Sequence, residues 1–340
     1  MNGLADRVPV FGQLHEFAAE HLGIPRQEFF TRPDLSVPAL LQTQQDFDID
    51  VASITFDVYN IEAEALGQEL VWINGCMPDV DRTKPLIQNR NDLARIRTPD
   101  FETAGRFQQV IRMNALFQEL TGLEPTLSFC APFSLAANLR GIEQLLIDMH
   151  ENPEFARGLM ETITDEVLAP WILYQKRRFP GAARVSGADA AASLPIVNLP
   201  ILKRWIIPSI QRLRQLCGPE IYVANWVGER YLPDPTEMLR LKLAVGPGAL
   251  WAQDPDVEIL GPSVFKEFAV AHDVPLVLGV GAGFLALASR GDVEARVREY
   301  VEVGGHGGRF ALYLCNVGAT TLPANLRAAV ETAHAIHPQP

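Results

Sequence analysis

The sequence of 340 residues has no apolar run near the roughly 18 residues that a membrane-spanning helix requires. Its opening residues, MNGLADRVPVFG, show no basic segment followed by an apolar one, so we expect no secretory signal and a cytoplasmic location. The 4 cysteines lack the paired spacing of zinc fingers and redox motifs, which favours reduced thiols over disulfides. Ser-His-Asp and HExxH patterns are also missing, so the sequence gives no sign of a serine hydrolase or of that metalloprotease class.

The chain is also short of positive charge, with a formal net charge of -12. This balance argues against nucleic acids and acidic membranes as partners, because both attract basic surfaces. Hydrophobic residues make up 48% of the chain, which is ample for one large core. We therefore expect a small molecule as the principal ligand.

Short apolar segments alternate along the chain with amphipathic segments of helical period. This alternation predicts parallel βα units. The fold expected is an α/β, eight-stranded (β/α)8 TIM barrel, forming one domain over residues 1–340 with an N-terminal helical extension at 1–48. A doubly wound open sheet is the alternative. The predicted strands cover residues 50–56, 126–129, 183–186, 220–224, 249–252, 275–278 and 310–314, and residues 69–73 form a hairpin strand or the eighth strand.

Acidic and sulfur-bearing residues follow several of these strands. Because catalytic groups of α/β barrels gather at the carboxyl ends of the strands, we expect them to converge. Asp57 directly follows the apolar run SITF, where an ionised carboxylate is costly unless it is paired or working; alternatively it caps the next segment. Asp189 lies in GADAAAS, whose small side chains would let a ligand approach; the alternative is an Asx turn or a helix cap.

Cys315 ends the last predicted strand, in FALYLCNVG. A thiolate at that place could bind zinc or attack an electrophile. The alternative is a buried thiol that acts as a small apolar side chain. Cys76, Cys130 and Cys217 are interpreted as structural or surface residues.

Five stretches resemble one known family along nearly the whole chain: DVASITFDVYNIEAEALG, APFSLAANLRG, DMHENPE, GADAAAS and LCNVGATTLPANLRAAV. Together they are similar to the uroporphyrinogen decarboxylase superfamily, which implies a (β/α)8 barrel. True decarboxylases of that superfamily bind a tetrapyrrole through an arginine-rich N-terminal segment. This chain has VPVFGQLHEF there, although Asp57 matches that branch's key aspartate. EAEALG and GADAAAS look more like the corrinoid-dependent methyltransferase branch.

That second branch implies a zinc ion held by a His-x-Cys pair and a distant cysteine. Cys315 matches the distant cysteine, but Asn225-Trp226-Val227 occupies the His-x-Cys position. Three options stay open: zinc held by another set such as Asp189, Glu229 and Cys315; metal-free catalysis by Asp57 or Asp189; or a changed reaction. The predicted site is catalytic Asp57 and Asp189, metal-binding Cys315 and Glu229, and substrate-binding Tyr59, Phe133, Asn225, Trp226 and Asp254.

The function predicted is removal of a methyl group from a small O-, N- or S-methyl compound and its transfer to a corrinoid protein or another carrier. A zinc ion or a protonated carboxyl would assist the leaving heteroatom. The alternatives are a decarboxylase or lyase that uses Asp57 on a small acid, and a ligand-binding barrel without catalysis. The partners expected are the substrate, the corrinoid protein and a second copy of the chain in a homodimer.

Overall fold

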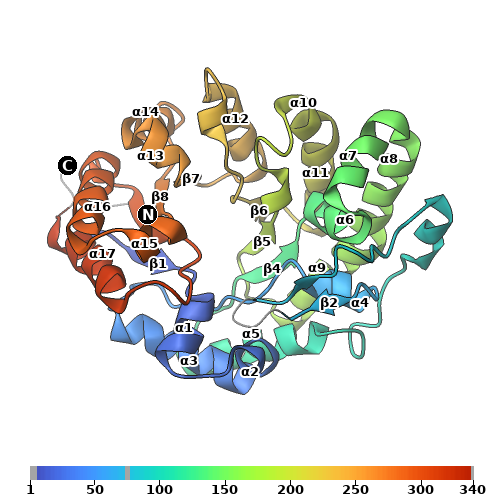
Figure 1. Ribbon diagram of the computed structural model, residues 1–340, viewed down its shortest axis with the longest axis horizontal. Helices are drawn as coiled ribbons and strands as arrows, with labels where there is room; N and C mark the ends of the chain where they lie inside the picture. Colours follow the sequence, from blue (N-terminus) through green and yellow to red (C-terminus); the bar gives the residue numbers. More distant parts are fainter. Residues whose placement is uncertain (1–5, 73–76, 338–340) are drawn as a thin grey trace. The chain divides into compact units, whose positions relative to one another are not determined.

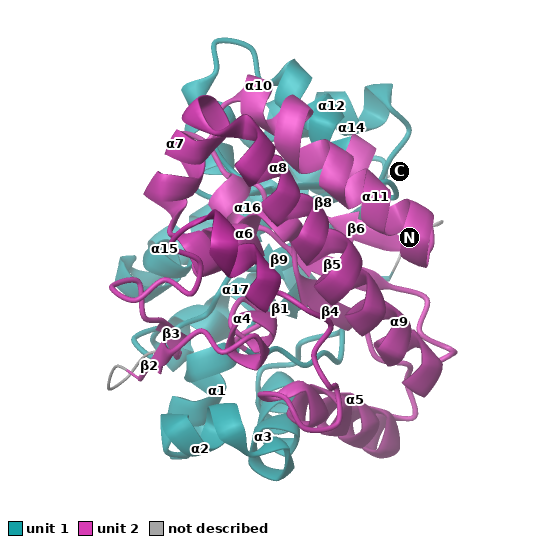
Figure 2. Ribbon diagram, turned by 90° about the vertical axis from the view of Figure 1, so that its right-hand side faces the viewer, with its two compact units in different colours: residues 1–56, 227–243, 247–340 teal, residues 57–226, 244–246 magenta. Residues whose placement is uncertain are grey.

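A computed structural model describes residues 6–72 and 77–337 (Figure 1). The predictions for Ile73 and Cys76 lie outside these residues. The chain forms two compact units, shown in different colours in Figure 2. Unit 1 comprises residues 1–56, 227–243 and 247–340, and unit 2 comprises residues 57–226 and 244–246.

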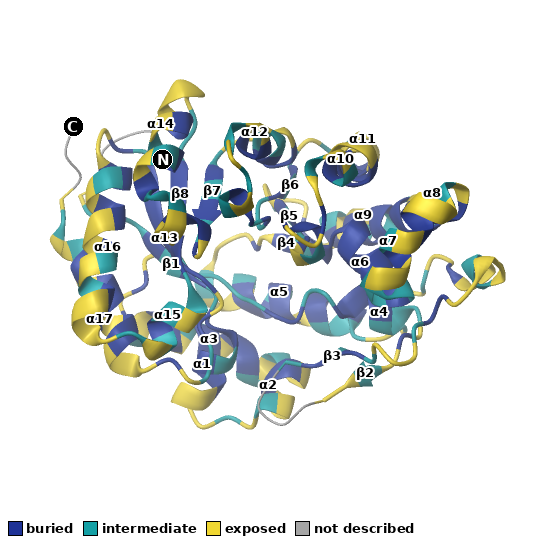
Figure 3. Cartoon of the chain, turned by 45° about the horizontal axis from the view of Figure 1, so that its top comes forward, coloured by how far each residue is buried: buried dark blue, intermediate teal, exposed yellow. Residues whose placement is uncertain are grey.

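Unit 1 contains a four-stranded parallel sheet in the order β1-β9-β8-β7. Every residue of β8 and β9 is buried (Figure 3), as expected for apolar parallel strands covered on both faces. The strands are β1 (Val10–Gly12), β7 (Leu250–Gln253), β8 (Leu276–Val280) and β9 (Phe310–Leu314). The helices of this unit are α1 (His15–His21), α2 (Arg26–Thr31), α3 (Pro33–Asp46), α13 (Asp256–Leu260), α14 (Pro262–Ala271), α15 (Ala282–Leu287), α16 (Arg290–Gly305) and α17 (Pro323–Ala335).

Unit 2 contains a three-stranded parallel sheet in the order β4-β5-β6, and an antiparallel hairpin of β2 with β3. The strands are β2 (Leu70–Val71), β3 (Asp79–Val80), β4 (Leu127–Cys130), β5 (Val185–Ala188) and β6 (Ile221–Val223). The helices are α4 (Ile61–Ala65), α5 (Phe107–Thr121), α6 (Pro132–Arg140), α7 (Ile142–Glu151), α8 (Pro153–Thr162), α9 (Ala169–Arg178), α10 (Leu199–Ile201) and α11 (Ile207–Cys217). Helix α12 (Thr236–Val245) begins in unit 1 and ends in unit 2.

Six of the predicted parallel strands are present, as β4 to β9; β9 has the predicted ends, and the ends of the other five differ by at most two residues. The strand predicted at residues 50–56 is wrong, because no strand forms there. That segment is held instead by isolated bonds: the Val10 amide donates to the Asp50 carboxylate at 2.7 Å, and the Ser53 amide donates to the Gln44 side chain at 3.0 Å.

The predicted N-terminal extension is not purely helical, because it contains β1. Three residues are too few to show an alternating pattern, and pairing with β9 is what makes them a strand. No helix in the described part of the chain is long and apolar enough to cross a membrane. The single-domain prediction stays a prediction.

Candidate functional site

The carboxyl ends of three adjacent strands bring most of the predicted site residues of unit 2 together. β4, β5 and β6 run parallel and side by side, with Cys130 opposite Ala188 and Gly187 opposite Val223. Residues that follow these strands therefore meet at one edge of the sheet. We call the resulting set the strand-end network; it consists of Tyr59, Ser134, Asp189, Asn225 and Trp226.

Asp189 is the centre of the strand-end network and is 0% exposed. One carboxylate oxygen accepts bonds from the Ser134 amide at 3.1 Å and the Ser134 hydroxyl at 2.9 Å. The other accepts a bond from the Trp226 indole at 3.1 Å. Burial raises the pKa of Asp189 to about 6, against the effect of these hydrogen bonds. The carboxylate therefore fixes Ser134, in the first turn of α6, and Trp226, in the loop that follows β6.

Asn225 links Asp189 to Tyr59. Its side-chain oxygen accepts a bond from the Asp189 amide at 2.9 Å, and its side-chain nitrogen donates to the Tyr59 hydroxyl at 2.8 Å. The Ala190 amide donates to the same hydroxyl at 3.1 Å. Burial raises the pKa of Tyr59, so the phenol is protonated at neutral pH.

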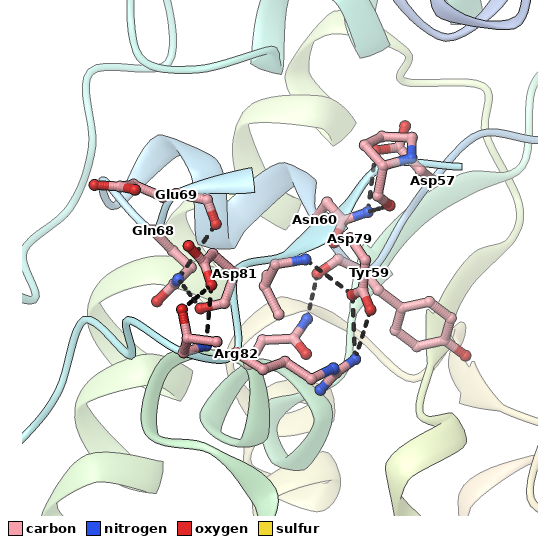
Figure 4. Close-up of polar contacts among 12 residues, drawn as sticks. Asp57, Tyr59, Asn60, Gln68, Glu69, Asp79, Asp81 and Arg82 are labelled. Carbon is pink, nitrogen blue, oxygen red and sulfur yellow. Dashed lines mark hydrogen bonds and ion pairs between the residues drawn. The ribbon is translucent and has the colours of Figure 1, made fainter. Parts of the chain in front are cut away.

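The segment that carries Tyr59 is fixed by amide side chains (Figure 4). Asn60 donates to the Pro78 carbonyl at 2.6 Å, and Gln68 donates to the carbonyl of Asp81 at 3.3 Å. Asn138 donates to the Tyr59 carbonyl at 2.7 Å. Figure 4 shows the Tyr59 ring directed away from these contacts with the hairpin. The backbone of Tyr59 is thus held independently of its hydroxyl.

Asp57 forms a two-point ion pair with Arg106, which lies directly before α5. The two Asp57 oxygens accept bonds from Arg106 at 2.9 and 2.6 Å, and the Asp57 side chain is 1% exposed. Arg106 also donates to Glu64 at 2.6 Å, and Asn60 donates to Asp57 at 3.2 Å. The paired arginine offsets the cost of burying the carboxylate, which is one of the two explanations expected from the sequence. Arg106 itself was missed, because nothing in the sequence links it to a partner 49 positions away.

Glu62, in the EAEALG motif, was also missed as a candidate. It is 0% exposed, and one of its oxygens accepts a bond from the Cys130 amide at 3.1 Å. Its other oxygen has no hydrogen-bond partner among the described residues. Burial raises the pKa of Glu62 to about 8. At neutral pH this carboxyl is therefore mostly protonated.

Cys315 and Asp254 lie in unit 1 and have different hydrogen-bond partners, although the charge of Asp254 also raises the pKa of Cys315. The Cys315 thiol donates to the Gln253 side-chain oxygen at 3.3 Å, and burial raises its pKa well above the ordinary value. Asp254 accepts bonds from the Gly281 amide at 3.0 Å, from Arg296 at 3.3 Å and from the Tyr300 hydroxyl. Cys315 is thus a neutral buried thiol in this structure, and the Asp254 carboxylate is occupied by the protein.

Glu229, the other predicted metal residue, is bound by a lysine. Lys242 donates to it at 2.6 Å, and the two side chains are 4% and 1% exposed for the lysine and the glutamate. Burial raises the pKa of Glu229, and the charge of Lys242 opposes this effect. Asp256 lies close by and accepts bonds from the Gly228 amide at 2.6 Å and from Arg230 at 2.9 Å.

Zinc is implied by the family resemblance, so we asked whether these residues fit it. The Cys315 thiol is bonded to an amide oxygen, and one oxygen of the Glu229 carboxylate is bonded to Lys242. Within residues 6–72 and 77–337 no three His, Cys, Asp or Glu side chains are grouped as a metal site. In this arrangement the donors do not fit the zinc set that the resemblance implies. The metal assignment of Cys315 and Glu229 stays a prediction.

The other predicted substrate-binding residues are placed as follows. Phe133 is 0% exposed in α6, and Trp226 is 1% exposed.

In unit 1 an aromatic cluster that was not predicted from the sequence lies beside Cys315. Phe11 and Tyr313 stack with ring centroids 5.0 Å apart, and Trp251 contacts both rings edge-on. Alternation along β1, β7 and β9 places these rings on one sheet face.

Parallel strands joined by helices, with polar side chains at their carboxyl ends, are typical of α/β proteins, and the (β/α)8 barrel is one of them. Residues 3–215 match the family model described as uroporphyrinogen decarboxylase (URO-D), and the chain therefore belongs to this family. The resemblance seen in the sequence and the TIM-barrel fold class are thereby confirmed.

Two relatives from Methanosarcina mazei are methyltransferases. The methylated-thiol–coenzyme M methyltransferase is 27% identical over 231 residues, which are 65% of this chain and 60% of that protein. The match thus spans about three fifths of that relative's length. A solved structure described as a methyltransferase shares the fold with a TM-score of 0.77 at 17% identity, and covers 97% of this chain and 94% of that one. The predicted similarity to the methyltransferase branch is confirmed.

Proposed function

We propose that this protein is a methyltransferase that removes the methyl group of a small S-, O- or N-methyl compound and passes it to a nucleophilic acceptor. The observation that carries the proposal is the similarity to a methylated-thiol–coenzyme M methyltransferase within a shared family. It favours an S-methyl compound as the donor and a thiol as the acceptor.

The reaction balances without an oxidant or a reductant. The bond between the methyl carbon and the donor heteroatom breaks, and the heteroatom keeps the electron pair. The acceptor, as a thiolate, forms the new bond to the methyl carbon. The proton that the acceptor thiol released ends on the donor heteroatom. The protein must therefore stabilise negative charge on the leaving atom, and a buried hydrogen-bond donor does this better than water.

The carrier predicted from the resemblance, a corrinoid protein, is kept as a proposed partner. A corrinoid would supply a strongly nucleophilic methyl acceptor when bound.

A cytoplasmic location and a homodimer also stay predictions. Size-exclusion chromatography with light scattering tests the homodimer. Zinc binding by Cys315 and Glu229 likewise stays a prediction. Elemental analysis of purified wild-type protein and of Cys315→Ser tests that assignment, and a Cys315→Ser variant that keeps both metal and activity would refute it.

The test of the main proposal is a methyl-transfer assay. Purified protein is incubated with methyl thioethers, methoxy-aromatics or methylamines, with 2-mercaptoethanesulfonate as acceptor, in the presence and absence of a reduced corrinoid. We expect demethylated donor and methylated acceptor in equal amounts, measured by mass spectrometry, with methyl thioethers as the best donors. If no donor loses a methyl group under any of these conditions, the proposal is wrong.

A decarboxylase or lyase acting through Asp57 is the second candidate, favoured by the description of the family model. Against it, both Asp57 oxygens are held by Arg106, so the carboxylate has little capacity left for a substrate. Release of carbon dioxide from uroporphyrinogen or from a small acid would support this candidate. A ligand-binding barrel without catalysis is tested by thermal shift with the same compounds, since a ligand stabilises the state it binds.

A further inference from the structure

The Tyr59 hydroxyl oxygen receives two hydrogen bonds from the protein. Asn225 donates to it at 2.8 Å and the Ala190 amide at 3.1 Å. A phenol oxygen has two acceptor positions and one hydrogen of its own. Both acceptor positions are therefore filled, and the hydroxyl can act only as a donor toward any further partner.

The direction of the Asn225 amide is fixed by its other neighbour. The Asp189 backbone N–H, 2.9 Å away, can only donate, so the atom that faces it must be the side-chain oxygen. The nitrogen of the amide consequently faces Tyr59. Turning the amide over would place two donors against each other and would break both bonds. The Asp189 side chain is held in turn by hydrogen bonds from Ser134 and Trp226. These residues at the strand ends therefore fix the orientation of the Asn225 amide.

The hydroxyl hydrogen of Tyr59 has no acceptor in the described part of unit 2. The side chain is partly exposed, unlike the fully buried Asp189 that supports it. A donor whose oxygen is saturated and whose hydrogen is unused is arranged in advance for an acceptor atom that arrives from outside.

We infer that Tyr59 is a catalytic hydrogen-bond donor to the heteroatom from which the methyl group leaves, and that Asn225 is the residue that positions it. This inference rests on the proposed methyltransferase function and names the substrate class as compounds whose leaving atom becomes anionic. As the carbon–heteroatom bond breaks, the electron pair stays on the heteroatom and the Tyr59 hydrogen bonds to it. The leaving thiolate is then protonated by the proton that the acceptor thiol released.

Burial keeps the phenol protonated, since it raises the pKa of Tyr59. A thiolate leaving group is a weaker base than the Tyr59 phenolate, so it is stabilised by the hydrogen bond without taking the proton. An alkoxide is a stronger base and would accept the proton from Tyr59. Thioethers and aryl ethers therefore need only the donor, whereas an alkyl ether also requires solvent to reprotonate the phenolate.

The experiment compares wild type with Tyr59→Phe, Asn225→Asp and Tyr231→Phe. Tyr59→Phe removes the donor and keeps the ring. Asn225→Asp is nearly isosteric and still accepts the Asp189 amide, but it cannot donate, so the Tyr59 hydrogen turns toward it. Tyr231→Phe is the matched control, because this tyrosine is 50% exposed. Circular dichroism and thermal unfolding establish that each variant folds.

We expect Tyr59→Phe and Asn225→Asp each to lower kcat by about 10²–10³-fold, the usual effect of losing a donor to a developing anion, with little change in KM. Among aryl methyl thioethers with graded leaving groups, the rate of Tyr59→Phe should depend more steeply on thiol acidity than that of wild type. A merely structural role would lower all rates equally.

The outcomes separate this inference from the function on which it rests. A wild-type protein that transfers no methyl group from any donor refutes both. An active wild type, with folded Tyr59→Phe equal to it in kcat and in leaving-group dependence, refutes the role of Tyr59 and leaves the methyltransferase proposal standing. Loss of activity in Tyr59→Phe with full activity in Asn225→Asp refutes the positioning role of Asn225.

Discussion

At the scale of single residues, Glu62 links the fold to pH. Its pKa is raised to about 8 from the ordinary value of 4.5, because the side chain is buried. Between these two pH values the native state binds more protons at this residue than the unfolded state does. The free energy of unfolding therefore falls as pH rises through that window, by up to about 1.4 kcal/mol per pH unit.

Glu62→Gln should remove this loss of stability. We expect the variant to be more stable than wild type near pH 8 and to differ least below pH 4.5, as measured by urea unfolding at several pH values. Glu119→Gln is the control, since the Glu119 side chain is 66% exposed. Parallel pH profiles for wild type and Glu62→Gln would show that Glu62 is ionised in the native state.

Gly279 is packed so closely that no larger side chain fits at this position without displacing its neighbours. A Cβ added there would lie 2.6 Å from the Cys315 sulfur and 2.7 Å from the Gln253 Cβ. Gly279→Ala should therefore break the contact between thiol and amide and destabilise the protein by about 1–3 kcal/mol, as overpacking usually does. Gly283→Ala is the matched control, because its added Cβ would meet nothing within 4 Å. Equal unfolding midpoints for the two variants would contradict the packing around Cys315.

At the scale of secondary-structure elements, Lys242 of α12 and Glu229, which begins the short turn at Glu229–Tyr231, form a buried ion pair. Lys242→Met leaves the Glu229 carboxylate buried without its partner, and we expect a loss of about 3–5 kcal/mol. Lys84→Met is the control, because the Lys84 and Glu69 side chains are 62% and 63% exposed. That exposed pair should contribute at most about 1 kcal/mol. Urea unfolding measures both, and a Lys242→Met effect no larger than that of Lys84→Met would contradict the prediction.

The strands that could be predicted from sequence are those with several consecutive apolar residues, such as β8 and β9. β1 could not be predicted, because it is three residues long and is defined by its partner. Segment 50–56 has the composition of a strand but lacks a ladder partner, so composition alone gave the wrong result.

The same distinction, between a local sequence pattern and dependence on a distant partner, applies to the residues of the site. Asp57, Asp189 and Asn225 could be found because they directly follow segments predicted as strands or lie in the loops after them. Arg106 and Glu62 could not, since their roles depend on which distant groups the fold brings to them.

At the scale of the whole molecule, the prediction of one domain means that the two units should unfold together in a single cooperative transition. Four tryptophans lie in unit 2, and Trp251 lies in unit 1. In a Trp251→Phe background, fluorescence therefore reports on unit 2 alone. Adding Lys242→Met, a change in unit 1, should lower the fluorescence midpoint as much as the midpoint by circular dichroism, because a cooperative domain unfolds in one step. A fluorescence midpoint that does not move would mean that the units unfold separately.

The pairing of β1 with β9 has a consequence for synthesis of the chain. Gln13 and Tyr313, which bond side chain to side chain next to that pairing, are 300 residues apart in sequence. A ribosome that adds about 5–20 residues per second needs about 15–60 s to cover that interval. During this time β1 has emerged while its neighbour in the sheet does not yet exist. Unit 2 lies between Gln13 and Tyr313 in the sequence, so its sheet can form while β1 is still unpaired. The sheet of unit 1 is completed only near the end of translation, and until then β1 has no strand beside it with which to pair.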